Sequence, residues 1–233
     1  LVSARAPMEM REAIEALQLT GPQVGFNGGL IYQIVDGKVK PLHIDILPRK
    51  TAQTILQAVR QHFPQISVSY YDMTNWDCDR IDEGIRLEFN ITRQAPTLIN
   101  EADFLAAKDN TFKIMMIALD NDELLALEKY LQALDLGEVS ILRSGQYHLE
   151  ITSKTAKKSK GIAYILKKEG LDKSQTAAFG DGHNDIPMFE MVGYPIVMGN
   201  AFPDIKELAY KVTRSNDEHG IGYGIRKYLK KIH

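Results

Sequence analysis

The chain has 233 residues, of which 44% are hydrophobic and 25% are charged, which is typical of a globular protein with a substantial core. Its net charge of -2, with basic residues spread along the chain, argues against a general nucleic-acid or membrane surface. Cys78 is the only cysteine, so an intramolecular disulfide and a cysteine zinc site are excluded, and we expect a reducing, cytoplasmic location.

The first 45 residues predict alternating strands and helices. Leu1–Ser3 resembles the end of a buried strand, and apolar residues at helical spacing predict a helix over Met8–Leu17. A short strand is expected at 24–26, followed by a turn at Asn27-Gly28-Gly29. Asp36-Gly37 lies between two apolar segments, and this pattern predicts a hairpin with strands over 30–35 and 39–46.

The middle of the chain has a different pattern, in which strands and helices mix. We expect helices over 51–62, 101–107 and 121–134, and strands over 66–71, 85–92, 112–119, 139–143 and 147–151. Asp120 should cap the third helix, with Glu123 completing a capping box. The section therefore predicts a separate α+β domain inserted into the first.

Regular alternation returns near the carboxyl end. We expect helices over 161–169, 186–191 and 203–208, and strands over 176–179, 195–198 and 210–213. Gly170 should end the first of these helices in the left-handed conformation. Short connections between alternating strands and helices indicate a parallel sheet.

The most informative motif is Gly180-Asp181-Gly182-His183-Asn184-Asp185, which follows an apolar strand and opens a helix. Ligands bind at the carboxyl ends of strands in open parallel sheets. Asp181 and Asp185 are four residues apart and would fall near one face of a helix, and such carboxylates suit Mg²⁺. Alternatively, these residues only cap the helix, and for Asp185 alone we give capping the same weight as metal binding.

Residues 179–188 resemble the fourth motif of haloacid dehalogenase-type phosphatases, in particular the Cof-like branch. The segments Val197–Ala201 and Ser215–Gly220 resemble the stretches that follow this motif. The resemblance implies a Rossmann-like parallel-sheet core made of 1–45 and 154–233, with an α+β cap domain at 46–153. It also implies hydrolysis of a small phosphorylated metabolite with Mg²⁺ held by Asp181 and Asp185.

Three further positions take roles from this resemblance. Ser159-Lys160-Gly161 resembles the third motif, where a lysine steadies the phosphoryl group, and we favour Lys160 over Lys158 on spacing. Ser3 resembles the phosphate-binding residue of the second motif, with Ala4 in place of a common glycine. Asn27 and Gly28 resemble the Asn-Gly turn that helps to bind phosphate, and Asn184 is expected to orient the metal loop.

The family's first motif, Asp-x-Asp-Gly-Thr, does not occur in these residues. Its first Asp would form an aspartyl-phosphate and its second would act as general acid and base. We expect this nucleophile upstream of Leu1, and we expect the 233 residues alone to be inactive. A phosphotransferase or phosphomutase, or an inactive phosphate-binding module, are the alternatives.

The remaining signals are weaker. His183 is interpreted as a loop residue close to the substrate, and the segment around Trp76 as a surface loop rather than a polar loop facing the active site. The sequence does not indicate the substrate or the oligomeric state.

Overall fold

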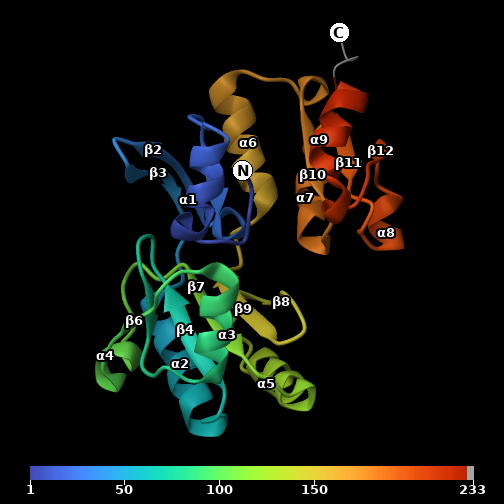
Figure 1. Cartoon of the computed structure of the whole chain (residues 1–233). Coiled ribbons are helices and arrows are strands. Elements are labelled where there is room, and N and C mark those ends of the chain that lie inside the picture. Colours follow the sequence, from blue (N-terminus) through green and yellow to red (C-terminus); the bar gives the residue numbers. More distant parts are fainter. Residues whose placement is uncertain (230–233) are drawn as a thin grey trace. The chain divides into compact units, whose positions relative to one another are not determined.

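The computed structural model describes residues 1–229, which belong to two compact units, Leu1–Ala156 and Lys157–His233 (Figure 1). The mixed α/β class expected from the sequence is confirmed. None of the helices within residues 1–229 is long and apolar enough to span a membrane. The predicted assignment of 1–45 and 154–233 to one core stays a prediction, and its last four residues lie outside those described.

The first unit begins with a helix and a small antiparallel sheet. Helix α1 (Pro7–Ala16) is followed by β1 (Gln23–Gly25), the 3₁₀ turn η1 (Phe26–Gly28), β2 (Leu30–Val35) and β3 (Lys38–Ile44). The strand order is β1-β2-β3, and Val35 pairs with Lys38. Asp36 and Gly37 both have positive φ, of 50° and 71°, which confirms the predicted hairpin turn.

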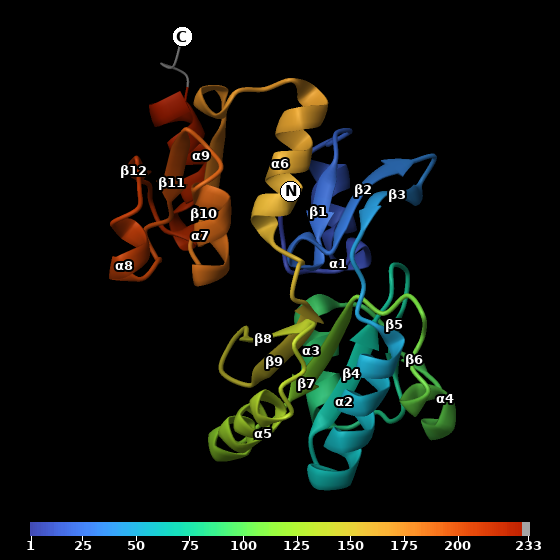
Figure 2. The ribbon, with the colours of Figure 1, turned by 180° about the vertical axis from the view of Figure 1, so that it is seen from behind.

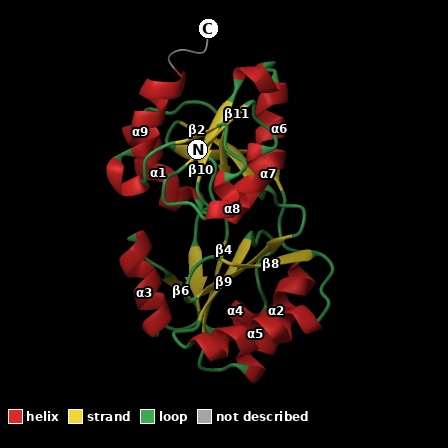
Figure 3. Cartoon of the chain, turned by 90° about the vertical axis from the view of Figure 1, so that its right-hand side faces the viewer, coloured by secondary structure: helices red, strands yellow, loops and turns green. Residues whose placement is uncertain are grey.

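A six-stranded sheet forms the rest of the first unit, in the order β6-β5-β4-β7-β9-β8. Its strands are β4 (Ser67–Tyr71), β5 (Trp76–Cys78), β6 (Thr97–Leu98), β7 (Lys113–Ile117), β8 (Val139–Arg143) and β9 (His148–Ser153). Its helices are α2 (Arg49–His62), α3 (Glu83–Thr92), α4 (Glu101–Leu105) and α5 (Asn121–Ala133). Figure 3 shows α3 on one side of this sheet and α2, α4 and α5 on the other.

Each face of this sheet carries its own apolar cluster. Leu56, Phe104 and Leu127 from α2, α4 and α5 pack with β-strand residues on one face. On the opposite face, Met10 of α1 and Tyr32 of β2 belong to the same cluster as strand residues of the large sheet. The six-stranded sheet and the small sheet β1-β2-β3 therefore share an apolar cluster within this unit.

Two sequence-based expectations for this unit are wrong. Residues 85–92 were expected to form a strand because apolar residues alternate there, but they belong to helix α3. Asp82 caps this helix by accepting a hydrogen bond from the Ile85 backbone N–H, and the alternating Phe89 and Ile91 remain 40% and 55% exposed. Trp76 does not lie in a surface loop, because it is buried in strand β5.

The second unit is built around the parallel sheet β10-β11-β12, with strands Ala177–Gly180, Tyr194–Val197 and Lys211–Val212 (Figure 2). Its helical segments are α6 (Lys158–Glu169), η2 (Lys173–Gln175), η3 (His183–Asp185), α7 (Ile186–Phe189), α8 (Pro203–Lys206), η4 (Asn216–Glu218), α9 (Gly220–Gly224) and the π-helical η5 (Ile225–Leu229). Gly170 ends α6 with a φ of 64°, as predicted. Helix α6 begins three residues earlier than expected, which places Lys158 in its first turn.

Candidate functional site

The Gly180–Asp185 loop leaves the carboxyl end of β10 and closes on itself. Oδ2 of Asp185 accepts hydrogen bonds from the backbone N–H groups of Asp181 and Gly182, at 3.0 and 3.1 Å. A Cβ at Gly180 would lie 2.5 Å from the same carboxylate oxygen, so the loop requires glycine there. The Asp185 side chain is therefore the buried support around which the loop folds.

A lysine completes the support of Asp185. Nζ of Lys158 donates a hydrogen bond to Oδ1 of Asp185 over 2.6 Å, and both side chains are less than 10% exposed. Lys160, two residues further along the helix, is exposed, because residues two apart point to different sides of a helix. The geometry thus favours Lys158, the position that spacing placed second, while the role of Lys160 stays a prediction.

Asp181 presents its carboxylate at the surface of the same loop. Its Oδ2 accepts a hydrogen bond from Nδ2 of Asn200 at 2.7 Å, and Oδ1 of Asn200 accepts one from the backbone N–H of Asn216 at 3.0 Å. The two segments that resembled the family's tail therefore meet at Asn200, which links them to Asp181. Sequence reasoning missed the role of Asn200, although the motif around it pointed to this segment.

The loop fits a magnesium ion bound by the Asp181 carboxylate better than one bound by both Asp181 and Asp185. Both oxygens of Asp185 already accept hydrogen bonds, whereas Asp181 is exposed and Mg²⁺ commonly takes one or two protein carboxylates with waters and phosphate oxygens. Within residues 1–229, no three His, Cys, Asp or Glu side chains gather into a ready-made metal site. Asp185 thus supports the loop that exposes the Asp181 carboxylate, and the expected metal roles of Asp181 and Asp185 stay predictions.

Ser3 and Asn27 are neighbours in the first unit. The backbone N–H of Ser3 donates to the Val24 carbonyl, and the Asn27 N–H donates to the Ser3 carbonyl, both over 2.9 Å. Asn27 is buried with a φ of 57°, and Gly28 has a φ of 106°. Left-handed backbone at a non-glycine residue is uncommon and clusters at functional sites. The structure therefore brings these three predicted residues together.

The other residues of the metal loop make local contacts. Nε2 of His183 lies 2.8 Å from Oδ2 of Asp204, and this hydrogen bond lowers the pKa of Asp204. A Cβ at Gly182 would lie 2.7 Å from Oδ1 of Asn184, so this amide packs closely against the loop. The proposed orienting role of Asn184 stays a prediction.

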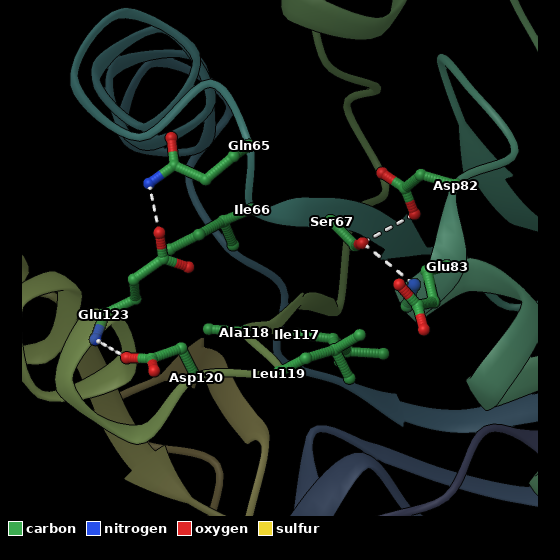
Figure 4. A pocket seen from close by; sticks show the side chains of 11 residues that line it. Gln65, Ile66, Ser67, Asp82, Glu83, Ile117, Ala118, Leu119, Asp120 and Glu123 are labelled. Carbon is green, nitrogen blue, oxygen red and sulfur yellow. Dashed lines mark hydrogen bonds between the residues drawn. The ribbon is translucent and has the colours of Figure 1, made fainter.

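Two pockets differ in their suitability for phosphate. One, of about 590 Å³, lies in the first unit and is lined by carboxylates of Asp82, Glu83, Asp120 and Glu123, without a basic side chain (Figure 4). The other, of about 570 Å³, lies in the second unit and includes Asn216, His219 and Arg226. Basic side chains and the link from Asn216 to Asp181 make the second pocket the better candidate for an anionic ligand.

Comparison with known proteins places these features in a family. A family model described as haloacid dehalogenase-like hydrolase matches residues 1–225. A protein of Haemophilus influenzae named "Putative phosphatase" is 30% identical over 221 residues, covering 94% of this chain and 80% of that protein. A similarly named protein of Streptococcus pyogenes is 36% identical over 137 residues, or 57% of this chain, and the match spans about half (51%) of that relative's length.

Solved structures agree with this assignment of the fold. A haloacid dehalogenase-like hydrolase from Bacteroides thetaiotaomicron has a TM-score of 0.87 at 24% identity, covering 97% of this chain and 85% of that one. A structure described as a subclass IIB sugar phosphatase has a TM-score of 0.80 at 19% identity, covering 98% and 84%. The chain belongs to the haloacid dehalogenase-like hydrolase family.

Proposed function

We propose that this protein is a magnesium-dependent phosphomonoester hydrolase that acts on a small phosphorylated metabolite, such as a sugar phosphate. The observation that carries the proposal is the buried pair of Lys158 and Asp185 beneath the exposed carboxylate of Asp181. Helix capping alone would explain the backbone hydrogen bonds of Asp185 but would not require a buried ammonium. The names of the relatives support phosphate esters as the substrate class.

In this proposal four residues of the second unit have separate roles. Asp181 would hold the metal and Asp185 would fix the position of the Asp181 loop. When bound, Mg²⁺ supplies positive charge that neutralises phosphoryl oxygens and orients them. The ammonium of Lys158 would stabilise negative charge that builds on the phosphoryl group and on the attacking carboxylate. Asn184 would keep the loop in its binding orientation.

In the first unit, Ser3 and Asn27 would donate hydrogen bonds to phosphoryl oxygens, and Gly28 would let the backbone approach closely. The attacking carboxylate would come from the Asp-x-Asp motif of the family. It would form a bond to phosphorus as the alcohol leaves with a proton from the second Asp, and water would then release phosphate. The division into a core of 1–45 and 154–233 and a cap of 46–153 is part of the same proposal.

The test is a phosphatase assay on the complete gene product, with p-nitrophenyl phosphate and a panel of sugar phosphates, in Mg²⁺ and after chelation. Asp181→Asn should lower magnesium-dependent kcat/KM on the order of a hundredfold or more, because it removes the carboxylate charge at the metal. Calorimetric titration with Mg²⁺ should show weaker binding as well. Asp122→Asn, an exposed carboxylate of α5, is the matched control and should change neither result.

Activity of Asp181→Asn equal to that of the wild type would refute the metal assignment. Transfer of phosphate to an added sugar in preference to water would instead identify a phosphotransferase. No turnover of any phosphomonoester by the complete gene product would favour an inactive binding module.

A further inference from the structure

The short segment after β11 is held on both sides by backbone hydrogen bonds. The Met198 N–H donates to the carbonyl oxygen of Gly180, at the end of β10, over 2.9 Å. The Gly199 N–H donates to the carbonyl oxygen of Arg214, which follows β12, over 3.0 Å. Because β11 is the central strand of the parallel sheet, the next residue, Asn200, comes between the segments that follow its two neighbours.

The Asn200 amide uses both of its ends in this position. Its Oδ1 accepts a hydrogen bond from the Asn216 backbone N–H at 3.0 Å, and its Nδ2 donates to Oδ2 of Asp181 at 2.7 Å. A backbone N–H can only donate, so it selects the oxygen end of the amide and turns the NH₂ group toward the carboxylate. Asn216 is itself anchored at the start of η4, where Glu218 accepts hydrogen bonds from the Ser215 N–H and hydroxyl. The fold therefore sets the orientation of this amide.

The hydrogen bond from Asn200 engages only one oxygen of Asp181. Within residues 1–229, no side chain or backbone N–H donates a hydrogen bond to Oδ1 of Asp181, and the residue is exposed. An amide is a neutral donor, so it fixes the carboxylate without opposing its charge. Asp185 differs in this respect, because the ammonium of Lys158 contacts its Oδ1. Asn200 therefore holds Asp181 and leaves the second oxygen to a cation.

The orientation of a carboxylate affects how strongly it binds a metal. Groups that hydrogen-bond a metal ligand typically change the metal affinity about 10–100-fold when they are replaced. An exposed aspartate that is free to rotate loses conformational entropy when a metal binds, whereas the contact with Asn200 restricts Asp181 beforehand. Loss of the Asn200 amide should therefore weaken metal binding, although the carboxylate itself remains.

We propose that Asn200 is a positioning residue, which holds Asp181 in the orientation that binds Mg²⁺ and leaves Oδ1 of Asp181 to the metal. The backbone N–H of Asn216 contributes by fixing the Asn200 amide. This inference rests on the proposed role of Asp181 in binding Mg²⁺, and it adds a residue that acts through Asp181 rather than on the substrate.

The experiment uses Asn200→Ala in the complete gene product, with Asn100→Ala as the matched control. Asn100 is also exposed, and its amide also donates to an aspartate, Asp103, and accepts a backbone N–H, but it caps α4 in the first unit. Calorimetric titration measures the Kd for Mg²⁺ in the absence of substrate. Hydrolysis of p-nitrophenyl phosphate is measured over a range of Mg²⁺ concentrations, and urea unfolding verifies that each variant is folded.

Asn200→Ala should raise the Kd for Mg²⁺ about tenfold or more. The Mg²⁺ concentration that gives half-maximal hydrolysis should rise by the same factor. At saturating Mg²⁺, kcat should return to the wild-type value, because Asp181 is still present. A purely structural role of Asn200 would instead lower kcat at every Mg²⁺ concentration. Asn100→Ala should leave the Kd and kcat unchanged.

A second variant, Asn216→Pro, removes the N–H that fixes the Asn200 amide. Proline fits the first position of a helical turn, and the extended backbone of Ser215, with a ψ of 168°, accepts a following proline. Asn216→Pro should raise the Kd for Mg²⁺ by a smaller factor than Asn200→Ala. In the double variant it should raise the Kd no further, because the amide on which it acts is already absent.

Mg²⁺ binding by Asn200→Ala as tight as that of the wild type would overturn this inference and leave the phosphatase proposal intact. A loss of kcat that saturating Mg²⁺ does not restore would also overturn it, as would independent effects of the two variants on the Kd. A wild type that binds Mg²⁺ but hydrolyses no phosphomonoester would count against the proposed function alone. A wild type that binds no Mg²⁺ would overturn both.

Discussion

Replacement of Lys158 by methionine tests the buried support of the metal loop. The variant removes the ammonium that lies 2.6 Å from Oδ1 of Asp185 and leaves a buried carboxylate without its counter-charge. Removal of one partner from a buried ion pair commonly costs roughly 3–5 kcal/mol. Oδ2 of Asp185 keeps two backbone N–H donors, so we expect the lower end, about 3 kcal/mol of unfolding free energy.

A loss of that size corresponds to a decrease in Tm of about 6–12 °C for a chain of this length. Urea unfolding followed by far-UV circular dichroism would measure it, because the only tryptophan, Trp76, lies in the other unit and does not report on this one. Lys160→Met is the matched comparison. Lys160 is exposed, so this variant should change the unfolding free energy by less than about 0.5 kcal/mol.

The double variant Lys158→Met with Asp185→Asn separates pairing from charge. Removal of both charges should recover part of the stability lost by the single variant, because no unpaired carboxylate remains buried. The reasoning would be refuted if Lys158→Met and Lys160→Met lowered the free energy of unfolding equally. It would also be refuted if Asp185→Asn lowered the free energy of unfolding of Lys158→Met by a further amount as large as the first loss.

Two further predictions concern close packing and pH. Gly180→Ala should abolish most hydrolysis and lower the free energy of unfolding by about 1–3 kcal/mol, because the new Cβ would lie 2.5 Å from Oδ2 of Asp185. Urea unfolding measures the loss of stability. Gly137→Ala is the control, because Gly137 has open space around it. Burial alone would raise the pKa of Glu88, but its hydrogen bond with His148 helps to hold that pKa below the ordinary 4.5. The free energy of unfolding of the wild type minus that of Glu88→Gln should therefore be largest above about pH 4.5 and should decrease as the pH falls. A difference that increases at acid pH would contradict this.

Local signals were sufficient where one strong pattern governed a short segment. Asp36-Gly37 predicted the hairpin because few residue pairs accept left-handed backbone at both positions, and Gly170 predicted a helix end for the same reason. The string Gly180–Asp185 predicted a tight turn at the end of a strand, because its glycines allow the backbone to turn sharply there. These features depend on residues near one another in the chain.

Tertiary context decided the positions where local signals competed. Residues 85–92 alternate as a strand would, but the cap from Asp82 and the packing of Gly84 against Ser67 on the large sheet select a helix. Trp76 seemed a surface residue among polar neighbours, but it is buried because β5 pairs with β4 along its whole length. In the first case the cap beside the helix acts together with packing on the sheet, and in the second case the preceding strand supplies the pairing partner.

The sequence by itself determined the family, the α/β class and the loop that carries Asp181 and Asp185. It did not determine which lysine supports that loop: the spacing favoured Lys160, but α6 begins at Lys158, and this start makes Lys158 the buried one. It also gave no sign that Lys113 and Glu150 are adjacent, since they come from strands 37 residues apart that sheet pairing brings together. Turns and loop motifs depend on consecutive residues and can be predicted from them, whereas burial and charge pairing arise only when the chain has folded.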